Sequence, residues 1–133
     1  RLLILPIPLV AAVNGHAFGL GAMILMASDY KVMREDRGYF CLPEVDLDMV
    51  LIPSMNALVR DKLVGQALRD LLLTGKRIGG ETAVEYNVVD QCCDLDELLT
   101  NAKALLQPML GKSRETLTGL KAGLHQDILR YID

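Results

Sequence analysis

Three glycines lie between two apolar segments near the start of the chain. Gly15, Gly19 and Gly21 follow apolar residues 7–13 and lead into apolar residues 22–27. Glycines at a strand-to-helix turn allow backbone N–H groups to point at an anion. Three interpretations are open: a dinucleotide site, a tightly packed turn without a ligand, and a backbone oxyanion hole. The spacing Gly-x-x-x-Gly-x-Gly disfavours the first, because a dinucleotide site uses Gly-x-Gly-x-x-Gly.

Glu44 is the side chain whose type and neighbours best suit proton transfer. It follows residues 40–43, Phe-Cys-Leu-Pro, and precedes a valine. A carboxylate shielded by apolar neighbours is suited to act as a general base. An alternative remains open, since Asp46 and Asp48 alternate with Glu44 and alternate residues of a strand share one face. The three carboxylates would then form a solvated edge.

Other polar residues carry weaker signals. His16 is expected to pack or to form a hydrogen bond, since nothing near it resembles a catalytic triad. Residues 34–37, Arg-Glu-Asp-Arg, suggest a solvated loop. Lys112, Arg114 and Lys121 could meet phosphate groups, but isolated basic residues on a terminal helix are expected at the surface.

The elements that position these residues begin with strands and end with helices. The apolar run 7–13 predicts a strand covered on both faces, and the pattern predicts a helix over 20–27 and strands over 29–33 and 38–45. The later segments predict a helix from Pro53 to Gly65, helices over 67–74 and 81–86, and an extended piece at 88–89. A long helix capped by Asp94 follows. The last predicted helix runs from Ser113 toward Tyr131, and its inward-facing residues are expected to be Leu117, Leu120, Leu124 and Ile128.

Composition narrows the class of protein. The 133 residues are 51% hydrophobic, which suits a single α/β domain. A net charge of -3 without a basic run disfavours nucleic acid as a partner. The apolar runs are interrupted by Pro or Gly and are too short to span a bilayer, so no membrane segment is expected. Cys41, Cys92 and Cys93 match neither a redox motif nor a metal-ligand spacing and are expected to be buried thiols.

Several segments, taken in order, resemble the crotonase (enoyl-CoA hydratase/isomerase) superfamily. The resemblance rests on Ala-Ala-Val-Asn-Gly-His-Ala-x-Gly-x-Gly at 11–21, Asp29-Tyr30, Pro43-Glu44, and on segments 73–78, 81–83 and 88–90, which together cover nearly the whole chain. The run 33–38, Met-Arg-Glu-Asp-Arg-Gly, is similar to one in plant enoyl-CoA Δ3,Δ2-isomerases.

The resemblance implies a fold and a set of site residues. The fold is α/β, a crotonase-like (ClpP/crotonase) ββα spiral fragment with a helical C-terminal region. Glu44 takes the position of the catalytic carboxylate, and the N–H of Leu20 becomes the second oxyanion donor. Gly19, Leu20, Pro43 and Pro53 are implied to contact substrate.

The position that holds a second carboxylate in hydratases is Met23 here. Adding water requires a group for each proton movement, whereas one carboxylate suffices to shift a double bond. The resemblance therefore favours an enoyl-CoA Δ3,Δ2-isomerase of unsaturated fatty acid β-oxidation over a hydratase. The third hypothesis is a truncated, non-catalytic family member that acts as an assembly subunit.

The resemblance also implies an organisation and partners. Residues 1–133 are interpreted as a partial domain, with 1–90 in the spiral core and 91–133 in C-terminal helices, and the first oxyanion donor is expected in a segment before residue 1. The partners are an acyl-CoA thioester and further copies in a homo-trimer or hexamer. Coenzyme A is part of the substrate, and no metal or redox cofactor is implied. Family resemblance suggests a peroxisomal location, and otherwise a cytoplasmic one.

Overall fold

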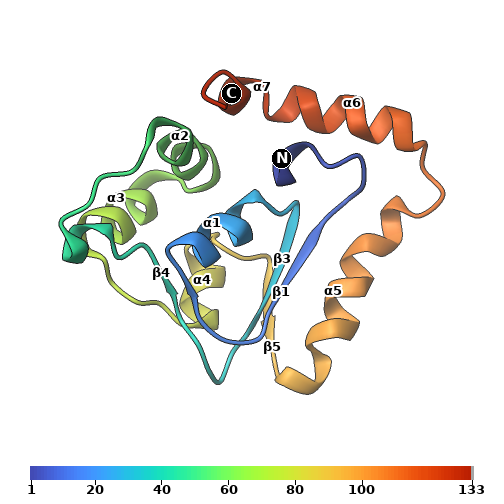
Figure 1. Ribbon diagram of the computed structural model, residues 1–133. Helices are drawn as coiled ribbons and strands as arrows, with labels where there is room; N and C mark the ends of the chain where they lie inside the picture. Colours follow the sequence, from blue (N-terminus) through green and yellow to red (C-terminus); the bar gives the residue numbers. More distant parts are fainter. Residues whose placement is uncertain (133) are drawn as a thin grey trace.

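A three-stranded parallel sheet forms the centre of the molecule. The computed structural model describes residues 1–132. The strand order is β1 (Val10–Val13), β3 (Tyr30–Arg34), β5 (Gln91–Cys93), with Val10 opposite Tyr30 and Val32 opposite Gln91. Figure 1 shows α5 (Leu98–Leu106) along one face of this sheet, with α1 (Leu20–Ala27) and α4 (Gly80–Glu85) on the other.

The central strand β3 is buried because both faces of the sheet are covered. Val32 packs against Leu98 and Ala102 of α5, while the next residue, Met33, belongs to the main core on the opposite face. Successive side chains of a strand point to opposite faces, so a strand between two helical layers must be apolar at consecutive positions. This explains why an apolar run, rather than an alternating pattern, marks these strands.

A second, shorter sheet carries the candidate site. The parallel strands β2 (Ala17–Phe18) and β4 (Phe40–Cys41) pair Ala17 with Phe40 and Phe18 with Cys41. The remaining helices are α2 (Pro53–Lys62), α3 (Gly65–Thr74), α6 (Arg114–Leu124) and α7 (Gln126–Leu129), with short 3-10 turns η1 (Leu2–Ile4), η2 (Glu44–Leu47), η3 (Leu95–Glu97) and η4 (Gln107–Met109). Within residues 1–132, no helix has both the length and the apolar character needed to cross a bilayer.

The helix over 20–27 is confirmed at both ends, but several boundaries were wrong. The strand expected over 7–13 begins only at Val10, because prolines at 6 and 8 lack the N–H that a ladder needs. The strand expected over 38–45 ends at Cys41, and Pro43 leads into the turn η2 instead. Glu44, Asp46 and Asp48 therefore do not share the face of a strand.

The extended piece expected at 88–89 was also misplaced. The N–H groups of Val88 and Val89 both donate to the carbonyl of Ala83, which continues the end of α4 as a turn. The carboxylate of Asp90 then accepts from the N–H of Lys31 at 2.8 Å, and β5 starts one residue later. Strand pairing with β3, rather than local β propensity, sets this position.

Helix boundaries differ for similar reasons. Gly65 was expected at the end of the helix from Pro53, but that helix stops at Lys62 and Gly65 opens α3. The long helix after Asp94 starts as the 3-10 turn η3. The last helix is divided into α6 and α7, and the prediction that Leu120 and Leu124 point inward was wrong, since they are 62% and 75% exposed.

A buried ion pair fastens α6 to the start of the chain. Lys121 Nζ lies 2.8 Å from Asp29 Oδ2 and also donates to the carbonyl of Ile7 at 2.8 Å. The same carboxylate oxygen accepts from the N–H of Leu9 at 2.7 Å. The expectation that Lys121 lies at the surface was wrong, because this ammonium is buried among partners that replace its water. Arg114 adds a bond to the carbonyl of Pro6 at 3.1 Å.

Lys121→Met should lower the free energy of unfolding by about 3 kcal/mol, because it leaves the Asp29 carboxylate buried without its counter-ion. Urea denaturation measures the change. The exposed Lys112→Met is the matched control and should change the free energy by less than about 0.5 kcal/mol. Equal effects of the two variants would show that the ion pair does not hold α6.

His125 predicts a pH dependence of stability. Desolvation lowers the pKa of this buried imidazole below its ordinary 6.5, and the charge of Lys62 lowers it further. The unfolded chain then binds a proton near pH 6.5 that the folded chain does not. The free energy of unfolding should fall as the pH drops below about 6.5, and His125→Leu should remove this part of the slope. Urea titrations from pH 7.5 to 5 test it, with His16→Gln as the control.

Candidate active site

The pairing of β2 with β4 brings the glycine turn and the Pro-Glu segment to one edge. Because the two strands are parallel, the segments that follow them leave the ladder at the same end. The N–H of Gly19 donates to the carbonyl of Cys41 at 3.3 Å, which is the last bond before the strands separate. Leu20 follows on one chain, and Pro43 and Glu44 follow on the other. The segments that contain residues 20 and 44 therefore both follow this edge of the short sheet.

Gly19 makes the turn into α1 possible. Its backbone has φ 52° and ψ -114°, a conformation that L side chains rarely adopt. Leu20 is the first residue of the helix and its φ is negative, so a leucine is accommodated there without strain. The first N–H groups of a helix have no acceptor within it. The Leu20 N–H has no acceptor among the described residues, which leaves it available to an anion.

Glu44 opens the turn η2 and lines an apolar cavity of about 430 Å³. This Glu44 cavity is also lined by Val45, Met49, Leu51, Asn56, Leu72 and Leu73. The Glu44 Oε2 atom is buried and has no hydrogen-bond partner within residues 1–132. Buried carboxylate oxygens are normally paired, so an unpaired one on a residue that lines a cavity is available for chemistry. The solvated-edge interpretation does not describe this oxygen.

Leu20 lines a different hollow from Glu44. Its side chain borders an apolar groove of about 250 Å³ together with Met23 and Met55. Met55 and Asn56 are adjacent in α2, and Asn56 lines the Glu44 cavity, so the two hollows flank the first turns of α2. The expectation of one cavity shared by Glu44 and the helix amides is not met within the described residues.

Pro43 and Pro53 bracket the segment between these hollows. Pro43 precedes η2 as its N-cap, and Pro53 is the first residue of α2. Proline suits both places, because its φ is preset for the first turn of a helix and its missing N–H is not needed there. Pro53 borders a third small hollow beside Asn56 and Tyr131 rather than the Glu44 cavity.

Gly75 supports the turn that carries Glu44, a contact that the motif pattern alone did not indicate. It ends α3 with φ 65°, and a Cβ added there would lie 2.7 Å from Asp46 Oδ2 and 3.1 Å from Val45 Cγ1. The Cys41 thiol donates to the carbonyl of Gly75 at 3.1 Å. Desolvation raises the pKa of this thiol, so it stays protonated and keeps donating.

Leu72 and Leu73 also belong to the site and were not predicted. Of the three successive leucines in α3, only Leu71 is fully buried in the core, and the next two line the Glu44 cavity. A run of three leucines is longer than one helical stripe needs. This excess is the signal in the sequence that could have identified the cavity wall.

The remaining polar residues of interest lie elsewhere. His16 Nδ1 accepts from the N–H of Tyr39 at 3.1 Å and the two rings are stacked, in agreement with the structural role expected of His16. Arg34 pairs with Asp36 in an exposed loop. No group of His, Cys, Asp or Glu side chains within residues 1–132 is arranged to hold a metal ion.

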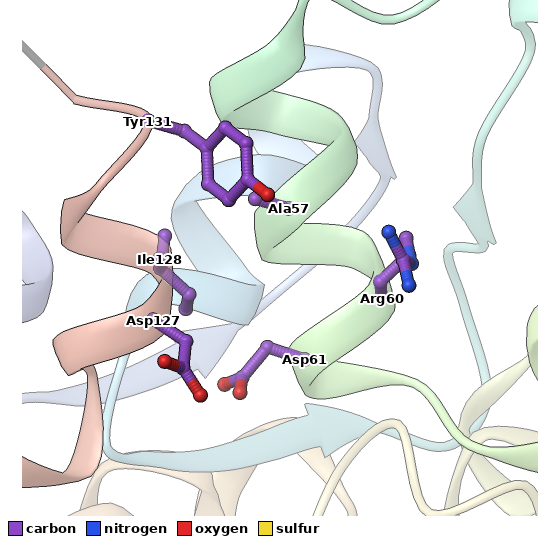
Figure 2. Close-up of a pocket in the computed structure, with 6 residues that line it drawn as sticks. All are labelled: Ala57, Arg60, Asp61, Asp127, Ile128 and Tyr131. Carbon is purple, nitrogen blue, oxygen red and sulfur yellow. The ribbon is translucent and has the colours of Figure 1, made fainter.

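A further hollow between α2 and α7 does not combine the predicted groups. It is lined by Ala57, Arg60, Asp61, Asp127, Ile128 and Tyr131. Figure 2 shows the carboxylates of Asp61 and Asp127 pointing toward one another, while Arg60 points away from both. None of the predicted site residues lines it, so the candidate active site remains at the β2–β4 edge.

Comparison with known proteins decides the family. The family model "Enoyl-CoA hydratase/isomerase" matches residues 1–130. The chain belongs to this family. The enoyl-CoA hydratase/isomerase fold that the resemblance implied is thereby confirmed, and so is the recognition of the superfamily.

Individual relatives of this hydratase/isomerase family refine the match. Enoyl-CoA delta isomerase 3 of Arabidopsis thaliana is 36% identical over 99% of this chain and 58% of its own length. The peroxisomal enoyl-CoA delta isomerase 2 of that plant is 36% identical over 96% and 55%. Carnitinyl-CoA dehydratase of Escherichia coli K12 is 33% identical over 86% and 43%. The chain thus spans little more than half the length of the isomerases that it matches.

Solved structures show the same hydratase/isomerase fold. The apo structure of an Mtb enoyl-CoA isomerase superposes with a TM-score of 0.90 at 24% identity, over 99% of this chain and 58% of that one. An enoyl-CoA hydratase/isomerase family protein from Pseudomonas syringae gives a TM-score of 0.91 at 24% identity, over 98% and 57%. At 24% identity, this structural similarity is evidence for the fold alone.

Gly75→Ala should lower turnover about ten- to a hundredfold, because the new Cβ displaces the turn that positions Glu44. Gly111→Ala is the matched control, since Gly111 also has a positive φ, of 78°, but its Cβ would meet no atom within 4 Å. Both variants should lose about 1 kcal/mol of stability from backbone strain. Steady-state conversion of an enoyl-CoA and urea unfolding separate the effects, and equal turnover in the two variants would contradict the positioning role of Gly75.

Proposed function

We propose that this chain carries the base and one oxyanion donor of an enoyl-CoA Δ3,Δ2-isomerase. The substrate is a 3-enoyl thioester of coenzyme A, and the product is the 2-trans-enoyl thioester. The observation that carries this proposal is the buried Oε2 atom of Glu44, which has no partner among residues 1–132 and borders an apolar cavity.

Methionine at position 23, in place of a carboxylate, favours isomerisation over hydration. Met23, at the position where hydratases of the family place that carboxylate, is buried and lines the apolar groove next to Leu20. A thioether cannot take up or release a proton, so of the two motif positions only Glu44 supplies a proton-transferring carboxylate. Hydration requires that a water molecule be deprotonated and C2 be protonated, whereas a double-bond shift moves one proton between two carbons.

The proposed reaction has two proton transfers. Glu44 takes a proton from C2 of the 3-enoyl thioester, and the electron pair of that C–H bond enters the conjugated system. This forms a dienolate whose negative charge lies on the thioester oxygen. The protonated Glu44 then returns the proton to C4, which leaves the double bond between C2 and C3 and restores the carboxylate.

The Leu20 N–H is the proposed donor to the dienolate oxygen. Its position at the first turn of α1 adds the partial positive charge of the helix N-terminus. Preorganised backbone donors of this type stabilise an oxyanion by roughly 3–4 kcal/mol each. The family pattern assigns the other donor to a segment that comes earlier in the chain than this one.

The cavity lining, the names of relatives and the exposed leucines support proposals for the acyl group, the location and the assembly. The apolar wall formed by Met49, Leu72 and Leu73 suits the hydrocarbon part of a fatty acyl group. A peroxisomal location is proposed because a plant relative is named peroxisomal. A homo-trimer or hexamer is proposed for the whole protein, and the exposed Leu95, Leu99 and Leu110 support an assembly.

Hydratase chemistry is the second candidate. Relatives at 33–34% identity are named carnitinyl-CoA dehydratase, and the matching family model is named for both hydratases and isomerases. A non-catalytic assembly subunit is the third. The full chain should convert a 3-enoyl-CoA at least about a hundredfold faster than it hydrates a 2-enoyl-CoA under the isomerase proposal. The opposite ratio would favour the hydratase, and neither activity would favour the subunit.

Glu44→Gln should lower kcat for 3-enoyl-CoA isomerisation at least about a hundredfold, with little change in KM, because the amide keeps the shape but cannot take the proton. The exposed Glu115→Gln is the control for the same chemical change and should keep full turnover. Binding of the acyl-CoA, measured by calorimetry, shows that the inactive variant is folded. Undiminished turnover in Glu44→Gln would remove Glu44 from the mechanism.

A further inference from the structure

A second cavity lies beneath α6, apart from the candidate active site. It has a volume of about 420 Å³ and is enclosed by α6, the start of β3 and the end of α2. Figure 1 shows α6 above the N-terminus of the chain. Leu20 opens α1 and Asp29 follows its end, so these eight helical residues place Asp29 about 12 Å from Leu20. Among the residues printed for the α6 cavity, none also lines the Glu44 cavity.

The charges that line this α6 cavity leave one positive charge uncompensated. Its acidic and basic side chains are Asp29, Lys62, Lys121 and His125. Lys121 and Asp29 neutralise each other through their ion pair. Lys62 lies 3.8 Å from Asp61, which is an ion-pair contact without a hydrogen bond, and the other carboxylate that acts on it, Asp29, is already paired with Lys121. Desolvation lowers the pKa of His125, which disfavours its charged form.

Two hydrogen-bonding groups in the α6 cavity lack partners. His125 is 5% exposed, and its Nδ1 has no partner within residues 1–132. The Lys62 ammonium donates to no acceptor among those residues and lies partly buried, and this desolvation lowers its pKa. Burying such groups without partners is costly. A single group with two acceptor oxygens and one negative charge would satisfy both, and a carboxylate has this form.

Most of the remaining lining is apolar. It includes Met109 and Leu117, Leu120 and Leu124 of α6. Leu120 and Leu124 are 62% and 75% exposed, which is unusual for leucines that line a hollow and leaves apolar surface in water. A ligand that covers them must carry an apolar part next to its charged head.

We propose that the α6 cavity binds the anion of a medium-length, straight-chain fatty acid. The carboxylate accepts from Lys62 and His125, and the alkyl chain lies along the leucines of α6. A phosphate dianion fits less well, because only one cation in the lining is uncompensated. The volume lies within the range of roughly 300–1,000 Å³ that small-molecule sites have. This site does not depend on the reaction proposed for Glu44.

The test is a calorimetric titration of the full chain with decanoate. Decan-1-ol, which has the same tail without the charge, should bind at least about tenfold more weakly, and acetate, which lacks the tail, should show no measurable binding. Equal binding of decanoate and decan-1-ol would overturn the proposal, because it would show that the cationic group plays no part.

Two variants locate the decanoate. Lys62→Met keeps the length of the side chain and should weaken decanoate binding at least about tenfold. It should fold normally, because it removes a charge that burial disfavours, and thermal unfolding checks this. Lys112→Met is the matched control on an exposed lysine. Leu73→Asn alters the Glu44 cavity and should leave decanoate binding unchanged, so a loss in this variant would place the ligand in the active site and overturn the proposal.

A second copy of the chain is the competing occupant of this surface. The mass of the full chain in solution, measured by light scattering, should be the same with and without decanoate. Leu124→Glu should weaken decanoate binding without changing that mass. Dissociation of an assembly by Leu124→Glu, together with no binding of decanoate to the unaltered chain, would show that a neighbouring subunit covers the leucines, and the fatty acid proposal would fall.

Discussion

The parallel pairing of two very short strands is the constraint on which the candidate site depends. Ala17–Phe18 and Phe40–Cys41 form a ladder of only two residues each. So short a ladder is marginal without outside support. Its carboxyl end is nevertheless the place from which both the glycine turn that leads to Leu20 and the Pro-Glu segment that carries Glu44 continue. Any change that slides one strand against the other would separate the oxyanion donor from the base.

Packing around the ladder supplies the support that the strands lack. Gly38 approaches Gly15 so closely that a Cβ at Gly38 would lie 2.2 Å from the carbonyl oxygen of Gly15, which only glycine permits. Phe40 exchanges backbone hydrogen bonds of 2.8 and 3.0 Å with Ile78, which continues the sheet on its other side. His16 ties the two strands again through the N–H of Tyr39. Contacts between residues that are far apart in the sequence therefore fix the register between β2 and β4.

The turn that carries Glu44 is also held by residues that are distant from it in the sequence. Gly75 and the Cys41 thiol hold η2 against the end of α3. Gly75 belongs to the segment that resembles the family's Leu-Thr-Gly pattern, so this segment supports the position of Glu44 by packing and does not itself transfer a proton. At the opposite end of the molecule, the Lys121–Asp29 pair holds α6 over the start of the chain and creates the second cavity. The site and the α6 cavity thus lie at opposite ends of α1 and are built from different contacts.

The sequence by itself determined the family, the helix over 20–27, the glycine turn and the candidate base, because these follow from local patterns: apolar periodicity, glycine where φ is positive, and motif order. It did not determine where the strand near 91–93 begins, that Glu44 lies on a 3-10 turn, that Lys121 is buried, or that Leu120 and Leu124 are exposed. Each of these depends on a partner distant in sequence. Asp90 bonds to Lys31, and Lys121 to Asp29, so strand position and burial are decided by pairing energies that a local pattern does not contain. Only the folded chain brings these partners together.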